Sequence, residues 1–598
     1  MLRLWGHYLL RYLVSSGRAG VSRLGEEIDI YLAVKLTIEE PPEIVVTSAS
    51  PTEQRRSFLS PDPFVVIGLV IVAACVRIWG LRWGLPDSTH LFSYHPDEYH
   101  SLRGLLSLAL NGDLNPHFFN YGSLYLYLVS AAGVLGHGAL ISWLSLETIP
   151  EALRVWTLDA RVVSALAGVL TVVTVYVLSR RIWSRLLAVF CTLLLALAPL
   201  HVLNSHYGTV DVTQALFVAL ALLFSVRLIK WGRWQDCVWA GLMAGLAAST
   251  KYNGLVVVVA PLTAIVLNCG NKARGHRAAD AARKMLIVLG VAALGFALTS
   301  PFTFLAWSEA KGDILFEFKH MRVGEPLAVA AEPNGFWFHA KNLLAPGAGP
   351  IVILALVGWV MVVVKRHRQL LPIAVFVCLW AVMISLANVR YARYEVALLP
   401  ALVVLGTYPL AQLLRGSRCY RWAGCLLVVV CAVPALLWTG QVCSGLAACD
   451  PRAEALGEIL RVTPAEARIG LVREPWFDVP PVDYCNGGAV LRRNPLWRLY
   501  HRPMRELAIT DLDKRLLSAQ APRTFVLSEF NSRAGLRAGD AKTTAFVLAL
   551  LTSYERQGRY GGLPLSFVPW ELGSDWLYPW PEIQIFVRKH LPSAAGGK

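Results

Sequence analysis

Eleven apolar runs that can act as membrane spans constrain this chain more than any other feature of its sequence. The chain has 598 residues, of which 55% are hydrophobic and 16% are charged, whereas about 25% are charged in soluble domains. We therefore predict an α-helical polytopic membrane protein with about 11 transmembrane helices. The predicted spans are residues 64–81, 162–179, 186–203, 210–229, 237–250, 255–267, 285–303, 350–364, 370–387, 396–414 and 422–438.

The basic residues between the spans indicate their orientation, because short loops rich in Lys and Arg stay in the cytoplasm. One further apolar stretch, 120–145, can cross the membrane, re-enter it or lie on its surface. If it does not cross, every strong basic cluster lies on one face, whereas a crossing moves these clusters outside. We therefore predict that 120–145 does not cross. The basic clusters are Arg180, Arg181 and Arg185; Lys230 and Arg233; Lys272, Arg274, Arg277, Arg283 and Lys284; Lys365, Arg366 and Arg368; and Arg415, Arg418 and Arg421.

The short runs 237–250 and 255–267 are predicted as two spans, since merging them into one broken helix would invert the charges downstream. The formal net charge of +16 then reflects the orientation of the spans. No basic stripe or recognition motif accompanies this charge, and we expect no nucleic-acid partner.

The composition becomes mixed polar and apolar after the last predicted span. Alternating runs such as 467–472 and 523–527 predict buried strands of a soluble α/β domain. No apolar core of the signal-peptide type precedes the first span, which we expect to direct insertion itself. The predicted parts are a cytosolic N-terminal extension, a transmembrane domain and an extracytoplasmic C-terminal α/β domain, at residues 1–62, 63–440 and 441–598.

The eleven cysteines show no CxxC pair and no zinc-type spacing. Most lie in apolar spans, where a cysteine behaves as a small buried hydrophobic residue. Cys443, Cys449 and Cys485 lie outside the spans and could include one disulfide in an oxidising compartment.

The acidic pair Asp97 and Glu98 follows the first span, on the predicted outer face. Acids in a first helical turn can simply cap the helix that Pro96 favours here, but carboxylates beside a membrane span mark a functional site by default. One of them can act as general base on a hydroxyl. Adjacent helical side chains point about 100° apart, so the other is expected to be structural. His95 and His100 leave a metal site with Asp97 open, although no tight ligand motif is present and we expect no metal.

Two more charged residues lie at outer ends of spans. Asp211 opens the span 210–229, either as a helix cap or as a second carboxylate of an outer cavity, with His206 nearby. Arg161 is a candidate ion-pair partner for Glu98 or Asp97, because an unpaired Arg would be costly there.

Three cations also end on the predicted outer face, namely Lys251, Arg390 and Arg393. Snorkelling to lipid phosphate is the structural explanation for such residues. Their convergence with the carboxylates favours instead a phosphate-binding site, since Arg holds phosphate by bidentate hydrogen bonds.

Four short segments follow the acidic pair in a distinctive order. They are Asn-Pro-His-Phe-Phe-Asn-Tyr-Gly at 115–122, Asp-Ala-Arg-Val-Val-Ser-Ala-Leu-Ala-Gly at 159–168, Thr-Val-Asp at 209–211 and Thr-Lys-Tyr-Asn-Gly at 250–254. With the acidic pair, this order resembles the GT-C glycosyltransferases, above all protein O-mannosyltransferases and the aminoarabinose transferases of lipid A. The resemblance covers about residues 60 to 415.

The resemblance implies an integral-membrane enzyme that transfers a sugar from a polyprenyl-phosphate or dolichyl-phosphate carrier to a hydroxyl acceptor. It implies a single inverting displacement with Asp97 as the base, Glu98 and Arg161 as a structural acid and arginine, and Asp211 at a second acidic position. It also implies juxtamembrane helices in the first outer loop. Lys251, Arg390 and Arg393 are then expected to stabilise the phosphate's charge, without a cofactor.

The partners implied are the lipid-linked sugar, membrane lipids and a protein, lipid or glycan acceptor. Residues 120–123 stand where these relatives often have two prolines, and no O-mannosyltransferase motif appears after residue 440, so the acceptor class stays open. We expect an integral, multi-pass protein of the plasma membrane, which in bacteria is the inner membrane, with its active site facing outside. A lipid or sugar transporter or flippase is the alternative; it would have charges in span centres and an internal repeat, neither of which is apparent.

Overall fold

The computed structural model describes residues 62–142, 148–269, 274–488 and 495–589. All of them belong to one unit, Pro61–Lys598. The predicted N-terminal extension 1–62 lies outside the described residues except for its last residue.

Each of the eleven predicted spans coincides with a helix or a broken helix. By length and composition, five described helices can cross a membrane, or six if α9 and α10, bent by 55°, form one span. The protein is an integral membrane protein. The span helices are α4 (Pro63–Ile78), α8 (Ile149–Arg180), α9 (Arg185–Ala196) with α10 (Pro199–Ser205), α11 (Val210–Trp231), α12 (Trp234–Thr250), η1 (Tyr252–Val258) with α13 (Val259–Cys269), α14 (Arg274–Thr299), α19 (Ile351–Val364), α20 (Leu371–Leu386), η3 (Ala392–Leu398) with α21 (Leu399–Arg415), and α22 (Arg418–Ala447).

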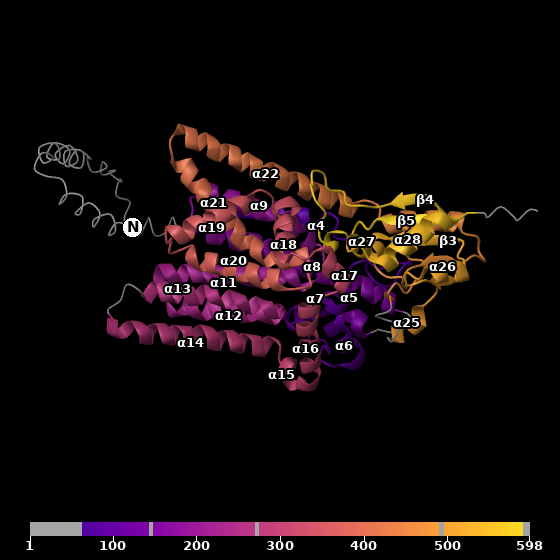
Figure 1. The fold of residues 1–598 in the computed structure, drawn as a ribbon. Coiled ribbons are helices and arrows are strands. Elements are labelled where there is room, and N and C mark those ends of the chain that lie inside the picture. The colour runs from indigo at the N-terminus through magenta and orange to yellow at the C-terminus, as the bar shows by residue number, and fades with distance from the viewer. Residues whose placement is uncertain (1–61, 143–147, 270–273, 489–494, 590–598) are drawn as a thin grey trace, which may run out of the picture. The chain divides into compact units, whose positions relative to one another are not determined.

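Small residues allow the long helices to approach closely, as is common in membranes. A Cβ at Gly241 or Gly245 of α12 would lie 2.5 or 2.3 Å from backbone oxygens of α14, so only glycine fits there. Figure 1 shows α12, α13 and α14 running in nearly the same direction, with the C-terminal sheet at one end of them.

The short predicted spans 237–250 and 255–267 are two helices, as expected. The chain leaves α12 at Lys251 in an extended conformation and turns into η1, which packs back on α12. A Cβ at Gly254 would lie 2.3 Å from the carbonyl oxygen of Ala247, so glycine allows this tight reversal.

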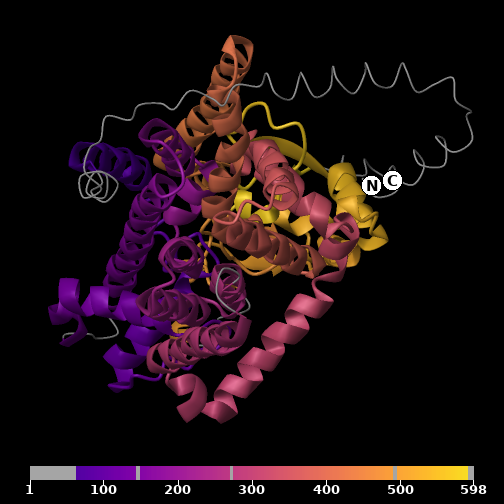
Figure 2. The ribbon, with the colours of Figure 1, turned by 90° about the vertical axis from the view of Figure 1, so that its left-hand side faces the viewer.

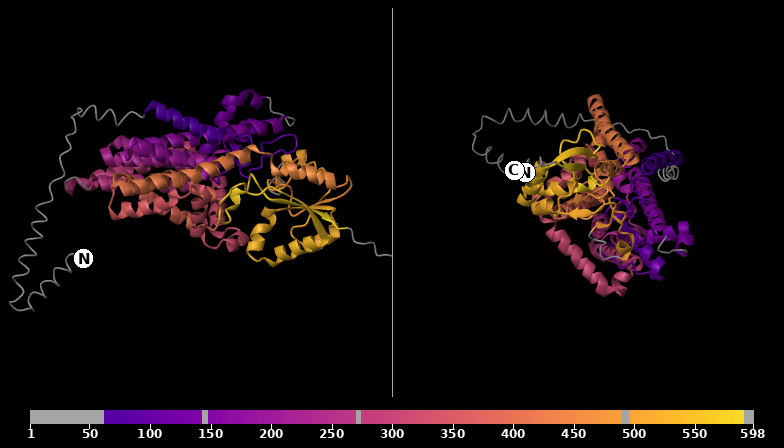
Figure 3. Two further views of the ribbon diagram at one scale, coloured as in Figure 1. Left: turned by 90° about the horizontal axis from the view of Figure 1, so that it is seen from above. Right: turned by 90° about the vertical axis from the view of Figure 1, so that its right-hand side faces the viewer.

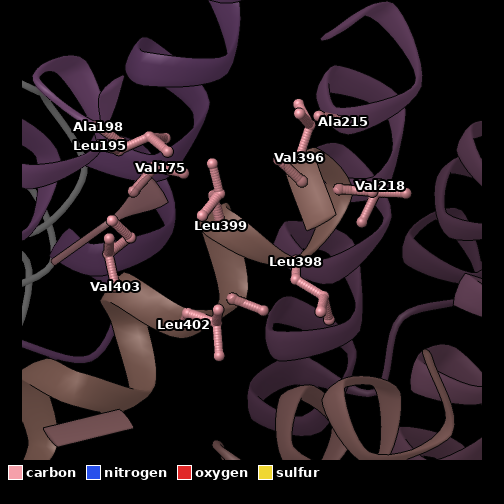
Figure 4. Close-up of a cluster of buried hydrophobic side chains, with 14 of the residues drawn as sticks. Val175, Leu195, Ala198, Ala215, Val218, Val396, Leu398, Leu399, Leu402 and Val403 are labelled. Carbon is pink, nitrogen blue, oxygen red and sulfur yellow. The ribbon is translucent and has the colours of Figure 1, made fainter. Parts of the chain in front are cut away.

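The broken helix η3–α21 passes through the centre of the bundle, where 89% of its apolar window is buried. Figure 4 shows its Val396, Leu398 and Leu399 packed among side chains of other helices, including Val175 and Val218. The polar residues at the N-terminal end of this helix, Arg393 and Glu395, are therefore buried inside the protein.

The predicted first outer loop contains three helices: α5 (Glu98–Ser101), α6 (Arg103–Asn111) and α7 (Leu124–Ser142). α7 packs against α6 and α8. That 120–145 does not cross the membrane stays a prediction. The segment between α14 and α19, predicted to lie on the same face, holds α15 (Phe302–Leu305), α16 (Trp307–Val323), α17 (Pro326–Ala331), α18 (Gly335–Asn342) and η2 (Leu343–Gly347). Figures 1 and 2 show α16 running across the direction of α14.

The C-terminal region is an α/β domain, and both predicted strands are present. Its sheet has the order β2-β1-β3-β5-β4, with β1 parallel to β2 and β3, and β5 antiparallel to β3 and β4. α23 packs on one face of the sheet, and α26 with α28 on the other; Figure 3 shows helices flanking the strands. The elements are α23 (Pro451–Val462), β1 (Ile469–Leu471), α25 (Pro495–Tyr500), β2 (Leu507–Ile509), α26 (Lys514–Gln520), β3 (Thr524–Ser528), α27 (Glu529–Arg537), α28 (Ala541–Ser553), β4 (Tyr554–Tyr560), η4 (Ser574–Trp576) and β5 (Ile583–Arg588).

The domain boundary at residue 441 stays a prediction; it falls inside α22, which continues to Ala447 and whose last turns pack against the bundle. One expectation about this region needs correction: the suggested disulfide is absent, since Cys443, Cys449 and Cys485 are all free. Cys443 is buried in α22, where its thiol donates to the carbonyl of Val76 at 3.2 Å.

Candidate active site

Asp97 lies directly before α5, where Pro96 turns the chain. Its carboxylate makes no capping hydrogen bond to the helix but forms an ion pair with the Nη1 of Arg393, at the start of η3. The Asp97 side chain is 24% exposed and faces a pocket. The pocket is lined by Phe92, Ser93, His95, Pro96, Asp97, Tyr99, His100, Trp476 and Gly487, the last two from the C-terminal domain.

Glu98 points elsewhere, as the helical geometry predicts for the neighbour of Asp97. Its carboxylate accepts two hydrogen bonds from Arg161, from Nε and Nη2, both at 2.8 Å. The backbone N–H of Gly208 donates a third at 2.7 Å. The Glu98 and Arg161 side chains are 1% and 0% exposed, so the predicted ion pair is confirmed and is sealed from solvent.

Arg161 uses its remaining donors to hold the end of the first span. Its Nη1 donates to the carbonyls of Leu81, at 2.9 Å, and of Trp83, and its guanidinium lies 5.5 Å from the Trp83 ring centroid. The pair therefore ties α8, α5 and the residues after α4 together.

Arg393 is held tightly but keeps one donor unused. It is 9% exposed, and its guanidinium lies 4.4 Å from the ring centroid of Tyr391. Its buried Nε has no hydrogen-bond partner. An unpaired buried guanidinium N–H is costly, and it is the kind of group that an anionic ligand satisfies.

Lys251 and Asp211 form a third ion pair, within electrostatic reach of Arg393. The Nζ of Lys251 donates to Asp211 at 2.8 Å, and the two side chains are 12% and 5% exposed. The same Nζ lies 4.6 Å and 5.6 Å from the ring centroids of Tyr394 and Tyr121. Gln214 fixes the turn that carries Lys251 by donating to the Lys251 carbonyl at 3.1 Å.

Two predicted site residues make their contacts elsewhere. Arg390 donates to the carbonyls of Ala387 and Pro333, both at 3.3 Å. His206 is fully buried, and its ring nitrogens lie 2.8 Å and 3.0 Å from the carbonyl oxygens of Val202 and Trp79. Asp97 is the one predicted site residue that lines the pocket itself; Arg393 reaches it through its ion pair with Asp97, and Arg390 and His206 do neither.

Sequence reasoning missed the aromatic rings that surround the cations. Tyr391 and Tyr394 flank Arg393 in the sequence, and this alternation of rings and cations was a usable signal. Tyr121 and the C-terminal Tyr578 carried no such signal, although the Tyr578 ring lies 5.0 Å from that of His95.

The charges around the pocket are set by burial and by Arg393. Burial by itself would raise the pKa of Asp97, but the adjacent Arg393 guanidinium outweighs it, and the pKa falls to about 2. Burial lowers the pKa of His95 to about 4 and also lowers that of His100. At neutral pH the pocket therefore holds an ionised Asp97 between two neutral imidazoles.

The absence of a metal in the site stays a prediction. Within residues 62–142, 148–269, 274–488 and 495–589, no group of three or more His, Cys, Asp or Glu side chains could hold a metal ion.

Residues 153–307 match the family described as dolichyl-phosphate-mannose-protein mannosyltransferase. This segment includes Arg161, Asp211 and Lys251. A comparison with curated proteins gives no match.

Among solved structures, the chain is similar to ArnT from Cupriavidus metallidurans in the apo state, with 17% identity and a TM-score of 0.48, over 89% of this chain and 99% of that one. It is similar to an oligosaccharyltransferase of Archaeoglobus fulgidus, with 14% identity and a TM-score of 0.46, over 82% and 71% of the two chains. The protein O-mannosyltransferase complex Pmt1–Pmt2 of S. cerevisiae gives 19% identity and a TM-score of 0.33, over 44% and 36%. The family match covers residues 153–307, about a quarter of the chain, and agrees with the resemblance to GT-C glycosyltransferases that the sequence motifs gave.

Proposed function

We propose that this enzyme transfers a sugar from a polyprenyl-phosphate or dolichyl-phosphate carrier to a hydroxyl acceptor, with inversion at the anomeric carbon and Asp97 as the general base. The observation that carries the proposal is the pairing of Asp97 with Arg393 at a pocket. A carboxylate that can take a proton stands there beside a buried cation with an unused donor. An inverting displacement at the anomeric carbon needs a base at the attacking hydroxyl and a cation that can bind the leaving phosphate.

Arg393 and Lys251 are the proposed phosphate-binding residues. The unpaired Nε of Arg393 can donate to a phosphate oxygen, and the Lys251 ammonium adds a second positive charge. As the bond from the anomeric carbon to the phosphate oxygen breaks, negative charge grows on that oxygen. Cations in a water-poor site stabilise this charge more than they would in water.

Donor binding and base activation are coupled in this mechanism. While Arg393 pairs with Asp97, the carboxylate has a pKa of about 2 and is a weak base. A donor phosphate competes for the same guanidinium and adds a negative charge near Asp97, so both effects raise the pKa of Asp97. The base thus gains strength only when the donor is bound.

In this proposal the bond to the acceptor forms and the bond to the phosphate breaks in one step. The acceptor oxygen forms a bond to the anomeric carbon while its proton passes to Asp97. The bond from that carbon to the phosphate oxygen breaks, and the lipid phosphate leaves with the electron pair. Attack opposite the leaving group inverts the anomeric configuration.

The other predicted site residues have supporting roles in this proposal. Glu98 and Arg161 fix the backbone on both sides of Asp97, and Asp211 orients Lys251. Arg390 and His206, which bond to backbone carbonyls, support the surrounding loops. We further propose that the site faces the outside of the plasma membrane and that the acceptor is a protein, lipid or glycan hydroxyl.

The test is transfer by the purified full-length chain in nanodiscs, with a panel of polyprenyl-phosphate sugars and with or without EDTA. Released polyprenyl phosphate in the presence of EDTA is the expected result, since chain cations replace a metal in the mechanism. No release from any donor, together with movement of a lipid-linked sugar across proteoliposomes, would instead establish the transporter alternative.

A further inference from the structure

The connection between β4 and β5, residues 561–582, leaves the soluble domain and packs against the transmembrane half. Trp570 donates from its Nε1 to the carbonyl of Lys341 at 2.9 Å. The backbone N–H of Gly573 donates to the Oδ1 of Asn342 at 3.0 Å. Trp438 of α22 donates to the carbonyl of Ser566 at 2.8 Å. The connection is thus attached to α18 and to α22.

Asp575, in η4 of this connection, contacts the start of η3 directly. Its Oδ1 accepts the backbone N–H of Ala392 at 3.1 Å, and its Oδ2 accepts that of Arg393 at 2.8 Å. The first N–H groups of a helix have no partner within the helix, and a carboxylate is well suited to satisfy them. Asp575 thereby fixes the backbone of the residue whose side chain pairs with Asp97.

The burial of Asp575 makes this contact costly to replace. The side chain is 5% exposed, and a buried carboxylate is tolerated only where it is hydrogen-bonded and near positive charge. Here the two N–H groups and the Arg393 guanidinium fill that role. The connection also supplies Tyr578, whose ring lies 5.0 Å from that of His95 at the pocket.

We propose that Asp575 is a positioning residue for Arg393, and that the soluble domain thereby completes the catalytic site. The function of Arg393 in this statement rests on the proposed function above. The positioning itself is a property of the backbone at 392 and 393, and it can be measured without any turnover.

The first experiment is hydrogen exchange on full-length protein in nanodiscs, comparing wild type with Asp575→Ala and Asp575→Asn. The amides of Ala392 and Arg393 should exchange faster in the alanine variant, and less so in the asparagine variant, which keeps one acceptor oxygen. The matched control is Asp540→Ala, which removes a carboxylate that accepts the N–H of Thr543 at the start of α28 in the same domain. Unchanged exchange at 392 and 393 in Asp575→Ala would overturn the positioning role.

The second experiment is a double-mutant cycle on sugar transfer with Arg393→Met. Asp575→Ala alone should lower kcat/KM about 10- to 100-fold, because small misplacements of a charged group cost this much, and Asp575→Asn should recover part of the loss. Asp540→Ala should stay within about twofold of wild type, since it is remote from the site. In the Arg393→Met background, Asp575→Ala should cost less than about twofold further. Independent, multiplicative losses would show that Asp575 does not act through Arg393.

The two experiments separate the inference from the proposed function. If the wild type transfers no sugar, the exchange measurement still decides whether Asp575 positions residues 392 and 393. Thermal unfolding of each variant is followed by intrinsic fluorescence. A fall in activity that merely tracks unfolding in Asp575→Ala, with the asparagine variant equally impaired, would contradict the proposal.

Discussion

Two ion pairs begin at adjacent residues of this chain, and they differ in almost every physical respect. Glu98 and Arg161 are sealed from solvent and joined by two hydrogen bonds of 2.8 Å, and the remaining donors of Arg161 bond to carbonyls. Asp97 is 24% exposed at a pocket and makes one contact with Arg393, whose Nε is unused. In the first pair every guanidinium nitrogen of Arg161 already has a partner, whereas the second pair has both an open face and an Nε of Arg393 without a partner.

Neighbouring carboxylates can thus divide structure and chemistry between them. Satisfied, buried charges resist change and hold the backbone. A partly exposed carboxylate with a replaceable partner can change its protonation state when a ligand arrives. The predictions below test this division.

The largest effect is expected from Glu98→Gln, which leaves Arg161 buried without a full counter-charge. Breaking one partner of a buried pair costs about 3–5 kcal/mol, and the variant should unfold at a clearly lower temperature. Thermal unfolding of the purified protein in detergent measures this, with Asp97→Asn as the matched control. An Asp97→Asn variant as destabilised as Glu98→Gln would erase the proposed contrast.

Arg393→Met should keep the fold and lower kcat by about 10²–10³-fold, as removal of one stabilising donor at a reacting oxygen does in other enzymes. Turnover with saturating donor measures the effect. If kcat is unchanged and only expression falls, then Arg393 is structural like Arg161.

Lys251→Met should lower kcat/KM for the donor about tenfold, the loss expected for one charge-assisted hydrogen bond. It also leaves Asp211 buried and unpaired, so the double variant Lys251→Met, Asp211→Asn should be more stable than the single one. Steady-state kinetics at varied donor concentration, together with thermal unfolding, check both statements. A double variant that is less stable than either single variant would be inconsistent with this ion pair.

The smallest effect is a shift between two pH profiles. The profile of kcat/KM reports the free enzyme, where Asp97 has a lowered pKa of about 2, so its acid limb should lie far below pH 5. Bound donor removes Arg393 from Asp97 and raises the pKa, so the acid limb of kcat should lie about 1–3 pH units higher. Coincident limbs would mean that donor binding does not release the base.

Much of the fold could be predicted from the sequence, because a lipid environment forces apolar stretches into helices whose backbone groups are satisfied internally. The apolar runs coincide with helices, the alternating run at 467–472 contains β1, and the run at 523–527 overlaps β3. α22 continues past the predicted span 422–438 to Ala447, because its final turns, of mixed composition, still pack against the rest of the protein.

The candidate site could be predicted only in part. Asp97, Glu98 and Arg161 are revealed by the cost of charge beside a membrane span. The partnership of Asp97 with Arg393 joins residues 296 positions apart, and it depends on how η3 enters the bundle. Asp575 lies a further 182 positions along the chain from Arg393, and an isolated aspartate in a loop carries no local pattern. Such contacts are products of tertiary packing and leave no periodicity in the sequence.

The most direct test of the central claim is the sugar-transfer rate of Asp97→Asn, measured beside donor binding by the same purified protein. The substitution keeps the size of the side chain and removes its basicity. If Asp97 is the base, transfer should fall about 10²–10⁴-fold, with the fold intact and polyprenyl phosphate still bound. Transfer at near the wild-type rate by the folded variant would contradict this role of Asp97.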